Sequence, residues 1–329
     1  MGDLILVTGG AGYVGSTLCR ELLSLGFQVK VLDNLTYGGK SLIGLLNHSN
    51  FEFCRGDLCK AQDIDACLSS DVKAIVHLAA IVGDVPCQLN PQLAVRVNYE
   101  ATAMLAEKAA RIGIPKFLFA STSSNYGISD AATLATESSP LNPVSLYAET
   151  KVDCEKLLLN MSGEQFAPVI LRFASAYGVS SRTRFDLTIN SLTFEALEDG
   201  SITVYAPDTW RPYVHVADMA NIFILALNAP IKTLGGRVLN GGSTQQNYRK
   251  RDVVGFIEEA IADPKPRVIY VDNEDDKRTY RVDCTRVRDV LGFRPKYSVR
   301  DGIRELIRAI ESGFLTVEDY EHDRLPSRV

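Results

Sequence analysis

The residues from Leu4 to Gly15, LILVTGGAGYVG, decide the fold. An apolar run ending at Thr8 predicts a buried strand, and the pattern from Tyr13 to Leu25 predicts an amphipathic helix. The glycines between them permit a tight turn, which brings an anion close to the free amides and the positive dipole end of the helix. Strand, glycine turn and helix in this order predict a dinucleotide site lined by Gly9, Gly12, Tyr13, Val14 and Gly15.

The acid that follows this turn bears on the choice of cofactor. No lysine comes after Gly15, which disfavours the phosphate loop of nucleotide triphosphatases. Asp33 ends the next predicted strand, 18 residues after Gly15. A carboxylate there can accept hydrogen bonds from an adenosine ribose, and it repels a 2′-phosphate. The pattern favours NAD over NADP, with a solvated residue at a strand end as the alternative interpretation of Asp33.

Strands and helices alternate over the first half of the chain. The strands are apolar on both faces, which is typical of a parallel sheet covered by helices on both sides. A long helix is predicted from the cap Asn90-Pro91 to Gly113. Further strands are predicted at 27–33, 51–55, 73–79, 116–121 and 169–173. We expect an α/β fold, a doubly wound parallel sheet of Rossmann type with a smaller C-terminal substrate-binding lobe.

The alternation loosens after Phe173. We expect residues 1–175 to form the NAD-binding domain and residues 176–329 to form the substrate-binding domain. Residues 213–242 are expected to pack back on the first domain, through a helix over 216–228 and a strand over 237–240.

Composition excludes several classes of protein. The 329 residues carry 35 Lys and Arg against 40 Asp and Glu, a net charge of −5 that is unlike the basic surface selected by nucleic acid. The longest nearly apolar stretch, Ala74 to Val82, is too short to span a membrane, and Met1-Gly2-Asp3 lacks the basic start of a secretion signal. We therefore expect a cytoplasmic protein. Seven cysteines without close pair spacing and four scattered histidines argue against disulfide frameworks and metal sites.

A threonine, a tyrosine and a lysine form the candidate catalytic group. Thr122 follows a predicted strand, at the sheet edge where ligands bind in open α/β folds. Tyr147 and Lys151 are four residues apart in a helical segment, so their side chains project from one face. The spacing alone is weak evidence. A tyrosine has a pKa of about 10, and a neighbouring ammonium favours its phenolate. We expect Tyr147 to be the base, Lys151 to tune it, and Thr122 to orient a substrate hydroxyl.

In combination these motifs resemble the extended short-chain dehydrogenase/reductase family, in its NAD-dependent nucleotide-sugar epimerase and dehydratase branch. The resemblance covers nearly the whole chain. It implies hydride removal from a sugar carbon, usually C4, with a 4-keto sugar as intermediate. The matching segments are Thr8–Gly15, Asp33–Leu35, Gly56–Leu58, His77–Ala80, Asn98, Thr122 with Tyr126-Gly127, Tyr147 with Lys151, and Arg211–Val216.

The resemblance also implies further contacts with the cofactor. Asp57 and Leu58 would hold the adenine, Ala79 and Ala80 would line the pyrophosphate and ribose, and Lys151 would also contact the nicotinamide ribose. The complete set that it adds to the glycine turn and Asp33 is Asn34, Asp57, Leu58, Leu78, Ala79, Ala80, Asn98 and Lys151.

Departures from the family pattern narrow the chemistry. Dehydratases of the branch typically carry acids directly after the catalytic threonine, where this chain has Ser123 and Ser124. Serines are poor acids and bases for eliminating water, so epimerisation is favoured, with 4-dehydrogenation or 4-ketoreduction as the alternative. Dehydration or a non-catalytic nucleotide-binding role ranks lower. The segments Ile81–Cys87, Ser180–Asn190 and Asp276–Tyr280 look similar to a subgroup that includes GDP-heptose 4-dehydrogenases.

Several residues are candidates for the nucleotide-sugar substrate and for assembly. Arginines can grip a diphosphate with a planar fork, although exposed surface arginines are the competing interpretation. Cys87 is a weaker candidate for facing the sugar. A homodimer is expected through the helix that starts near Asn90 and the one that carries Tyr147. The predicted substrate contacts are Ser123, Ser124, Ser175, Arg184, Asn190, Arg211 and Arg278.

Overall fold

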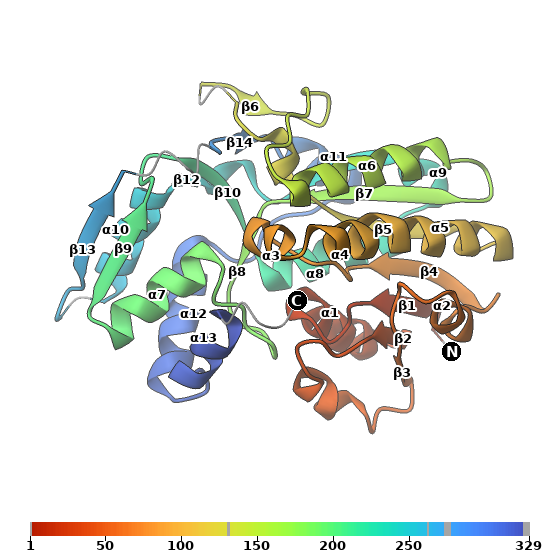
Figure 1. Cartoon of the computed structure of the whole chain (residues 1–329), viewed down its shortest axis with the longest axis horizontal. Helices are drawn as coiled ribbons and strands as arrows, with labels where there is room; N and C mark the ends of the chain where they lie inside the picture. Colours follow the sequence, from red (N-terminus) through yellow and green to blue (C-terminus); the bar gives the residue numbers. More distant parts are fainter. Residues whose placement is uncertain (1, 130–131, 262, 273–277, 325–329) are drawn as a thin grey trace.

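A computed structural model describes residues 2–129, 132–261, 263–272 and 278–324 (Figure 1). A seven-stranded sheet forms its centre, and every neighbouring pair of strands in it is parallel. The strand order β11-β7-β5-β4-β1-β2-β3 reverses direction at β1 and β4, where a doubly wound sheet forms its ligand crevice. Its strands are β1 (Leu4–Thr8), β2 (Gln28–Asp33), β3 (Phe51–Arg55), β4 (Val72–His77), β5 (Lys116–Thr122), β7 (Ala167–Phe173) and β11 (Arg237–Gly241).

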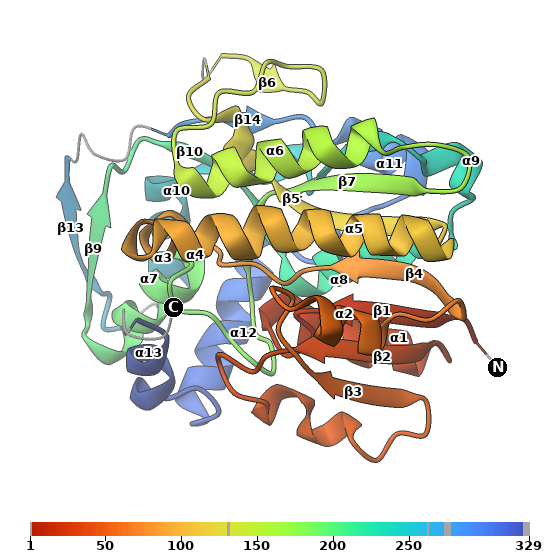
Figure 2. The ribbon, with the colours of Figure 1, turned by 45° about the vertical axis from the view of Figure 1, so that its right-hand side comes forward.

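Helices cover both faces of this sheet (Figure 2). On β1, Ile5 and Leu6 point to opposite sides and belong to different hydrophobic clusters, as the two-residue period of a strand requires. One cluster includes Leu18 of α1 and Phe223 of α8. The other includes residues of α2, α5 and α6. These helices are α1 (Tyr13–Ser24), α2 (Ala61–Cys67), α5 (Ala101–Ile112), α6 (Leu146–Asn160) and α8 (Val216–Asn228).

The helix predicted from Asn90 to Gly113 is present, but it is not uniform. Asn90 caps α4 (Pro91–Val95) by accepting from the Leu93 amide at 3.1 Å, and Gly113 ends α5 with a left-handed φ of 82°. Between them Arg96–Glu100 forms a π-helical segment, labelled η2. The apolar period did not reveal this segment, because one extra residue per turn shifts the pattern only slightly. Such insertions often occur at functional sites, and this one carries Asn98.

The smaller lobe has its own core, which includes Phe185, Ile202 and Leu306. Its chain forms a three-stranded sheet in the order β12-β10-β8 and a two-stranded sheet of β13 and β9. Residues 213–215 lie in β10, whereas α8 packs on α1 and β11 joins the large sheet beside β7. The elements are α7 (Thr188–Glu198), β8 (Ser175–Tyr177), β9 (Ser201–Tyr205), β10 (Trp210–His215), β12 (Asn247–Arg249), β13 (Arg267–Val271), α10 (Lys250–Ala260), α12 (Val299–Glu311) and α13 (Val317–Arg324).

Short elements connect these parts. The connecting elements are η1 (Lys40–Leu45), α3 (Asp84–Leu89), η3 (Ser123–Tyr126), β6 (Leu134–Ala135), α9 (Ile231–Leu234), η4 (Thr244–Gln246), β14 (Arg281–Val282) and α11 (Thr285–Leu291).

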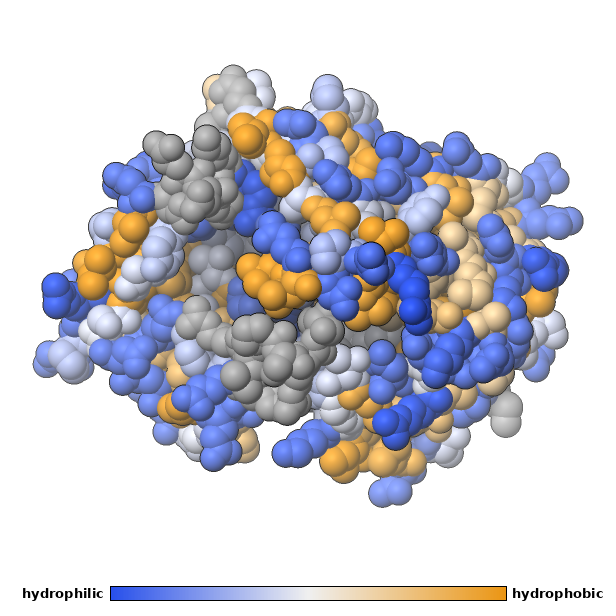
Figure 3. All heavy atoms as spheres, in the orientation of Figure 1, coloured by the Kyte–Doolittle hydropathy of each residue, from blue (hydrophilic) through white to orange (hydrophobic). Residues whose placement is uncertain are grey.

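Within the described ranges, no helix combines the length and the apolar composition that crossing a bilayer requires. Figure 3 shows hydrophilic residues over much of the face viewed, with separate apolar patches between them.

Candidate active site

The carboxyl ends of the central strands bring the predicted site residues to one edge of the sheet. The glycine turn follows β1, Asp33 ends β2, and Leu78 to Ala80 follow β4. Thr122 ends β5, and α6 packs beside that strand with Tyr147 in its first turn. Because all of these strands are parallel, groups that are far apart in sequence share one crevice.

The glycine turn is shaped so tightly that side chains would not fit. Gly9 has a φ of 73°, and a Cβ there would lie 2.7 Å from the Ala79 amide nitrogen. A Cβ on Gly15 would lie 2.2 Å from the Gly9 carbonyl oxygen. Gly12 is the N-cap of α1, and because glycine has no side chain, no capping group occupies the first amides of the helix. This cradle fits the pyrophosphate of a dinucleotide.

Asp33 supports the turn and retains capacity for a ligand. One carboxylate oxygen accepts from the Ala11 amide at 3.0 Å, and the other accepts from the Leu35 amide at 2.8 Å. Burial raises the pKa of Asp33, and the two backbone amides oppose that rise. A carboxylate has about four acceptor positions, so two remain for ribose hydroxyls.

The other residues predicted to contact the adenosine make contacts that hold their own loops in shape. Asn34 accepts from the amide and the hydroxyl of Thr36, at 3.0 and 2.7 Å. Asp57 accepts from the Cys59 amide at 2.9 Å, and Leu58 is buried against the cluster formed by α2, α5 and α6. These contacts fix the loops after β2 and β3 beside the crevice.

Three predicted ligand contacts have side chains that are committed to the protein. The Tyr13 hydroxyl donates to the Gly178 carbonyl at 2.7 Å. Asn98 accepts from the Ile81 amide at 2.8 Å and donates to the Ile81 carbonyl at 3.0 Å. Asn190 accepts from the Gly178 amide at 3.0 Å. All three are buried, so these side chains hold the loops of the site together.

Tyr147 and Lys151 lie near each other on α6, and Thr122 ends β5, the strand on which α6 packs. The Thr122 hydroxyl oxygen accepts from the Ser124 amide at 3.1 Å and keeps its own proton for donation. The Lys151 ammonium donates to the Ala120 carbonyl at 2.9 Å. It lies 5.9 Å from the centre of the Tyr147 ring. Lys151 therefore lies between Tyr147 and the backbone of β5, which it contacts two residues before Thr122.

Burial acts on the two titratable members of this group in opposite directions. Burial raises the pKa of Tyr147, and the charge of Arg184 partly opposes that rise. Burial lowers the pKa of Lys151 to about 8, although the nearby Cys154, Cys87 and Glu155 act to raise it. Tyr147 therefore needs added positive charge to act as a base near neutrality, and an oxidised nicotinamide would supply it.

The opposite wall of the site joins two predicted residues, Ser124 and Arg211, to Tyr280, which was not among the predicted site residues. The Tyr280 hydroxyl lies 3.2 Å from the Ser124 hydroxyl, and the Arg211 guanidinium lies 5.5 Å from the centre of the Tyr280 ring. Arg211 also donates to the carbonyls of Trp210 and Arg278. The likeness of segment 276–280 to a family subgroup gave Tyr280 no role, because its partner Ser124 is 156 residues away in the chain. Residues 276 and 277 lie outside the described residues.

Two of the three arginines predicted to grip a diphosphate have carboxylate partners within the protein. Arg184 forms a forked pair with Asp186 at 2.9 and 2.5 Å. Arg278 forms an ion pair with Asp84, the first residue of α3. Any phosphate that binds these arginines must compete with an existing carboxylate.

Most of the remaining candidates are buried. Ser123 is 1% exposed, whereas Ser175 on β8 is half-buried. Cys87 is fully buried, its thiol donates to the Ile81 carbonyl at 3.4 Å, and burial raises its pKa to about 11. His77 lies between the hydroxyls of Thr8 and Thr102, where burial lowers its pKa to about 3.

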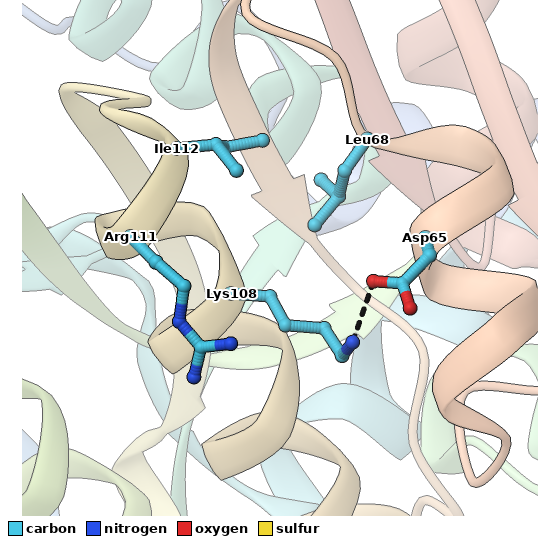
Figure 4. A pocket seen from close by; sticks show the side chains of 5 residues that line it. All are labelled: Asp65, Leu68, Lys108, Arg111 and Ile112. Atoms are coloured by element: carbon cyan, nitrogen blue, oxygen red, sulfur yellow. Dashed lines mark hydrogen bonds and ion pairs between the residues drawn. The ribbon is translucent and has the colours of Figure 1, made fainter.

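Other surface hollows of the protein lie away from this crevice. One, of about 190 Å³, lies between α2 and α5 and is lined by Asp65, Leu68, Lys108, Arg111 and Ile112 (Figure 4). An ion pair of 2.5 Å joins Lys108 to Asp65 there. These helix ends precede β4 and β5, so the hollow lies at the opposite edge of the sheet. Among the described residues, no group of three or more His, Cys, Asp or Glu side chains could hold a metal ion.

Known proteins share both the sequence pattern and this architecture. The sequence model of the NAD dependent epimerase/dehydratase family matches residues 5–242. The chain belongs to this family. A dTDP-glucose 4,6-dehydratase of Streptomyces griseus is 32% identical over 313 residues, which cover 91% of each chain. A UDP-glucose 4-epimerase of Mycolicibacterium smegmatis is 30% identical, over 92% of this chain and 96% of that protein.

A solved structure agrees with these relatives. The UDP-glucuronic acid 4-epimerase from Bacillus cereus, in complex with UDP-glucuronic acid and NAD, superposes with a TM-score of 0.83 and 27% identity. The alignment covers 93% of this chain and all of that one. Membership confirms the predicted fold class, the extended short-chain dehydrogenase/reductase resemblance, the enzyme class and the NAD cofactor. Epimerases and dehydratases both occur among the relatives, so membership alone does not select the reaction.

Proposed function

We propose that this family member is a nucleotide-sugar 4-epimerase that acts through a 4-keto sugar. The observation that carries the proposal is that α6, with Tyr147 and Lys151, packs on β5, which ends in Thr122 and is followed by two serines instead of two acids. Ser124 pairs with Tyr280 and Ser123 is buried, so neither offers an acid or base for eliminating water. The carboxylate of Asp84 also influences Tyr147, but it is engaged by Arg278.

The chain's own residues would perform the proton chemistry. Gly9 to Gly15, Asp33, and the loops at Asp57 and Ala79 would hold NAD, which supplies a hydride acceptor for sugar C4 when bound. Tyr147 would remove the proton of the C4 hydroxyl, and Thr122 would hold that hydroxyl by donating to it. Lys151 would stabilise the phenolate of Tyr147. Tyr147 would return the proton to O4 as the hydride comes back to C4 on the opposite face of the sugar, and the two transfers together would complete an inversion.

Net 4-dehydrogenation, or 4-ketoreduction in the reverse direction, is the second candidate. It uses the same three residues and differs in whether the reduced cofactor leaves. The buried contacts of Tyr13 and Ser180 favour retention, because they tie the smaller lobe to the start of α1. The Ser180 hydroxyl donates to the Tyr13 carbonyl at 2.7 Å.

An anaerobic assay distinguishes the two reactions. The protein loaded with NAD is incubated with UDP-, dTDP-, GDP- and CDP-sugars, and reduced nicotinamide and the sugar products are followed by absorbance and NMR. Inversion at C4 without net reduced cofactor supports the epimerase. Accumulated keto sugar with reduced cofactor supports the dehydrogenase instead. Tyr147→Phe should abolish either reaction, and a product lacking water would contradict both.

We further propose a separate role for each of the two domains. Residues 1–175 would bind NAD and residues 176–329 would bind the nucleotide sugar, with the diphosphate near Arg184, Arg211 and Arg278. A cytoplasmic location also remains a prediction.

We also propose a homodimer through the helical face that includes α3, α5 and α6. Val85 and Leu89 on α3 are 65% and 54% exposed, and Figure 3 shows an apolar patch in that region. The molar mass in solution tests it, and a monomer at micromolar concentration would contradict it.

A further inference from the structure

A buried charged network lies directly beneath the end of β5. Glu155 belongs to α6, and it follows Tyr147 and Lys151 by four-residue steps on the same helix face. Its side chain is 2% exposed, as buried as any apolar core residue. A carboxylate at such a depth is costly unless charged and polar partners surround it.

Arg172 of β7 supplies the charge. Its Nη2 donates to Glu155 Oε2 at 2.6 Å, and its Nε lies 3.0 Å from Oε1. The same guanidinium donates to the Tyr126 hydroxyl at 3.1 Å, and that hydroxyl donates to Asn240 of β11 at 2.7 Å. The network therefore joins α6 to two further strands of the sheet.

Glu155 also holds both sides of the turn that carries Thr122. The Ser121 hydroxyl, one residue before Thr122, donates to Glu155 Oε1. The Asn125 amide, three residues after Thr122, donates to the same oxygen at 2.8 Å. Ser121 and Asn125 are also bonded to each other at 3.1 Å. One carboxylate thus fixes the turn from Ser121 to Asn125 against the helix that carries Tyr147.

Two features indicate that this network is kept for geometry and not for stability. Among the described residues, Asn125 Oδ1 has no hydrogen-bond partner although the residue is fully buried, which costs free energy. Buried ion pairs also rarely stabilise a fold more than apolar residues of similar volume do. What the network does provide is a direct hydrogen-bonded link from α6 to the end of β5 and to the turn that follows it.

We propose that Glu155, through Arg172, Ser121 and Asn125, is a positioning residue that sets the distance between the Thr122 hydroxyl and the Tyr147 phenol. The proposal rests on the proposed function of those two groups. Without the network the turn at Thr122 shifts relative to α6, while the glycine turn and Asp33, which belong to other strands, stay in place. A misplacement of about 1 Å costs on the order of 100-fold in rate.

The test removes both buried charges together. Glu155→Met/Arg172→Met leaves no unpaired charge, so it avoids the severe destabilisation of a single substitution. We expect kcat for the best nucleotide sugar to fall about 100-fold, while KM and bound NAD change less than about threefold. Amide hydrogen exchange should become faster at residues 121–126. Asn125→Ala should show a smaller effect in the same direction, and it serves if the double variant does not fold.

Lys116→Met is the matched control. Lys116 lies at the other end of β5 and is buried, and its ammonium donates to the Ala229 carbonyl at 2.9 Å. We expect it to lower stability without lowering kcat. A kcat within about threefold of wild type in the double variant, or a change confined to KM, would overturn the positioning role. If the wild-type protein converts no nucleotide sugar, the proposed function fails, and the exchange rates at residues 121–126 decide the positioning proposal alone.

Discussion

Replacing Gly15 by alanine tests two opposing effects: a steric clash in the cofactor-binding turn and a gain in helix propensity. The added Cβ would lie 2.2 Å from the Gly9 carbonyl oxygen and 2.7 Å from the Gly10 Cα. Both are backbone atoms, so no flexible side chain can move aside. The turn itself must shift, and such overpacking costs about 1–3 kcal/mol. Alanine returns about 1 kcal/mol of helix propensity, so we expect a net loss of up to about 2 kcal/mol.

Gly255→Ala is the matched control, since it also replaces a helical glycine. A Cβ at Gly255 in α10 meets no atom within 4 Å. We expect it to stabilise the protein by about 1 kcal/mol and to leave NAD binding unchanged. Urea unfolding measures the stabilities, and titration with NAD measures the affinities.

The decisive comparison is the affinity for NAD. A shift of the Gly9 carbonyl moves the cradle at the start of α1, so Gly15→Ala should weaken NAD binding by at least about tenfold, or 1.4 kcal/mol. If Gly15→Ala binds NAD as tightly as Gly255→Ala does, the turn is not the pyrophosphate site.

Three further predictions concern charge. Lys151→Met should lower kcat about 100-fold with little change in nucleotide-sugar affinity, and an unchanged kcat would remove its tuning role. Asp33→Asn should weaken NAD binding about tenfold. It should also reduce the ratio of the affinity for NAD to that for NADP, as measured by titration with both cofactors. Burial holds the pKa of His77 near 3, below its unfolded value of about 6.5, so its contribution to stability is complete above pH 6.5 and declines as pH falls. The free energy of unfolding of wild type, relative to His77→Gln, should therefore fall by up to about 1.4 kcal/mol per pH unit in that window, and a pH-independent difference would contradict this.

Local pattern predicted most of the central fold. β1 and β3 have the bounds that their apolar runs indicated, and α8 begins and ends at the expected residues. The short strands β12, β13 and β14 and the helices α3, α10 and α12 were not assigned from sequence. β12 and β14, with three and two residues, contain too few residues to show a period. β13 is as long as β1, but the strand it pairs with, β9, is far away in the chain.

The candidate site was predictable where neighbouring residues form it. The sequence by itself determined the strand, glycine turn and helix, the acid at the end of β2, and the pair Tyr147 and Lys151, because each depends on spacing within one or two elements. Only the tertiary structure decided the pairing of Arg278 with Asp84, 194 residues apart, and of Tyr280 with Ser124, 156 residues apart. It also decided that Glu155 holds the turn at Thr122. Periodicity shows which face of its own helix or strand a residue lies on. The partner of a buried polar group depends instead on how elements distant in the sequence pack together.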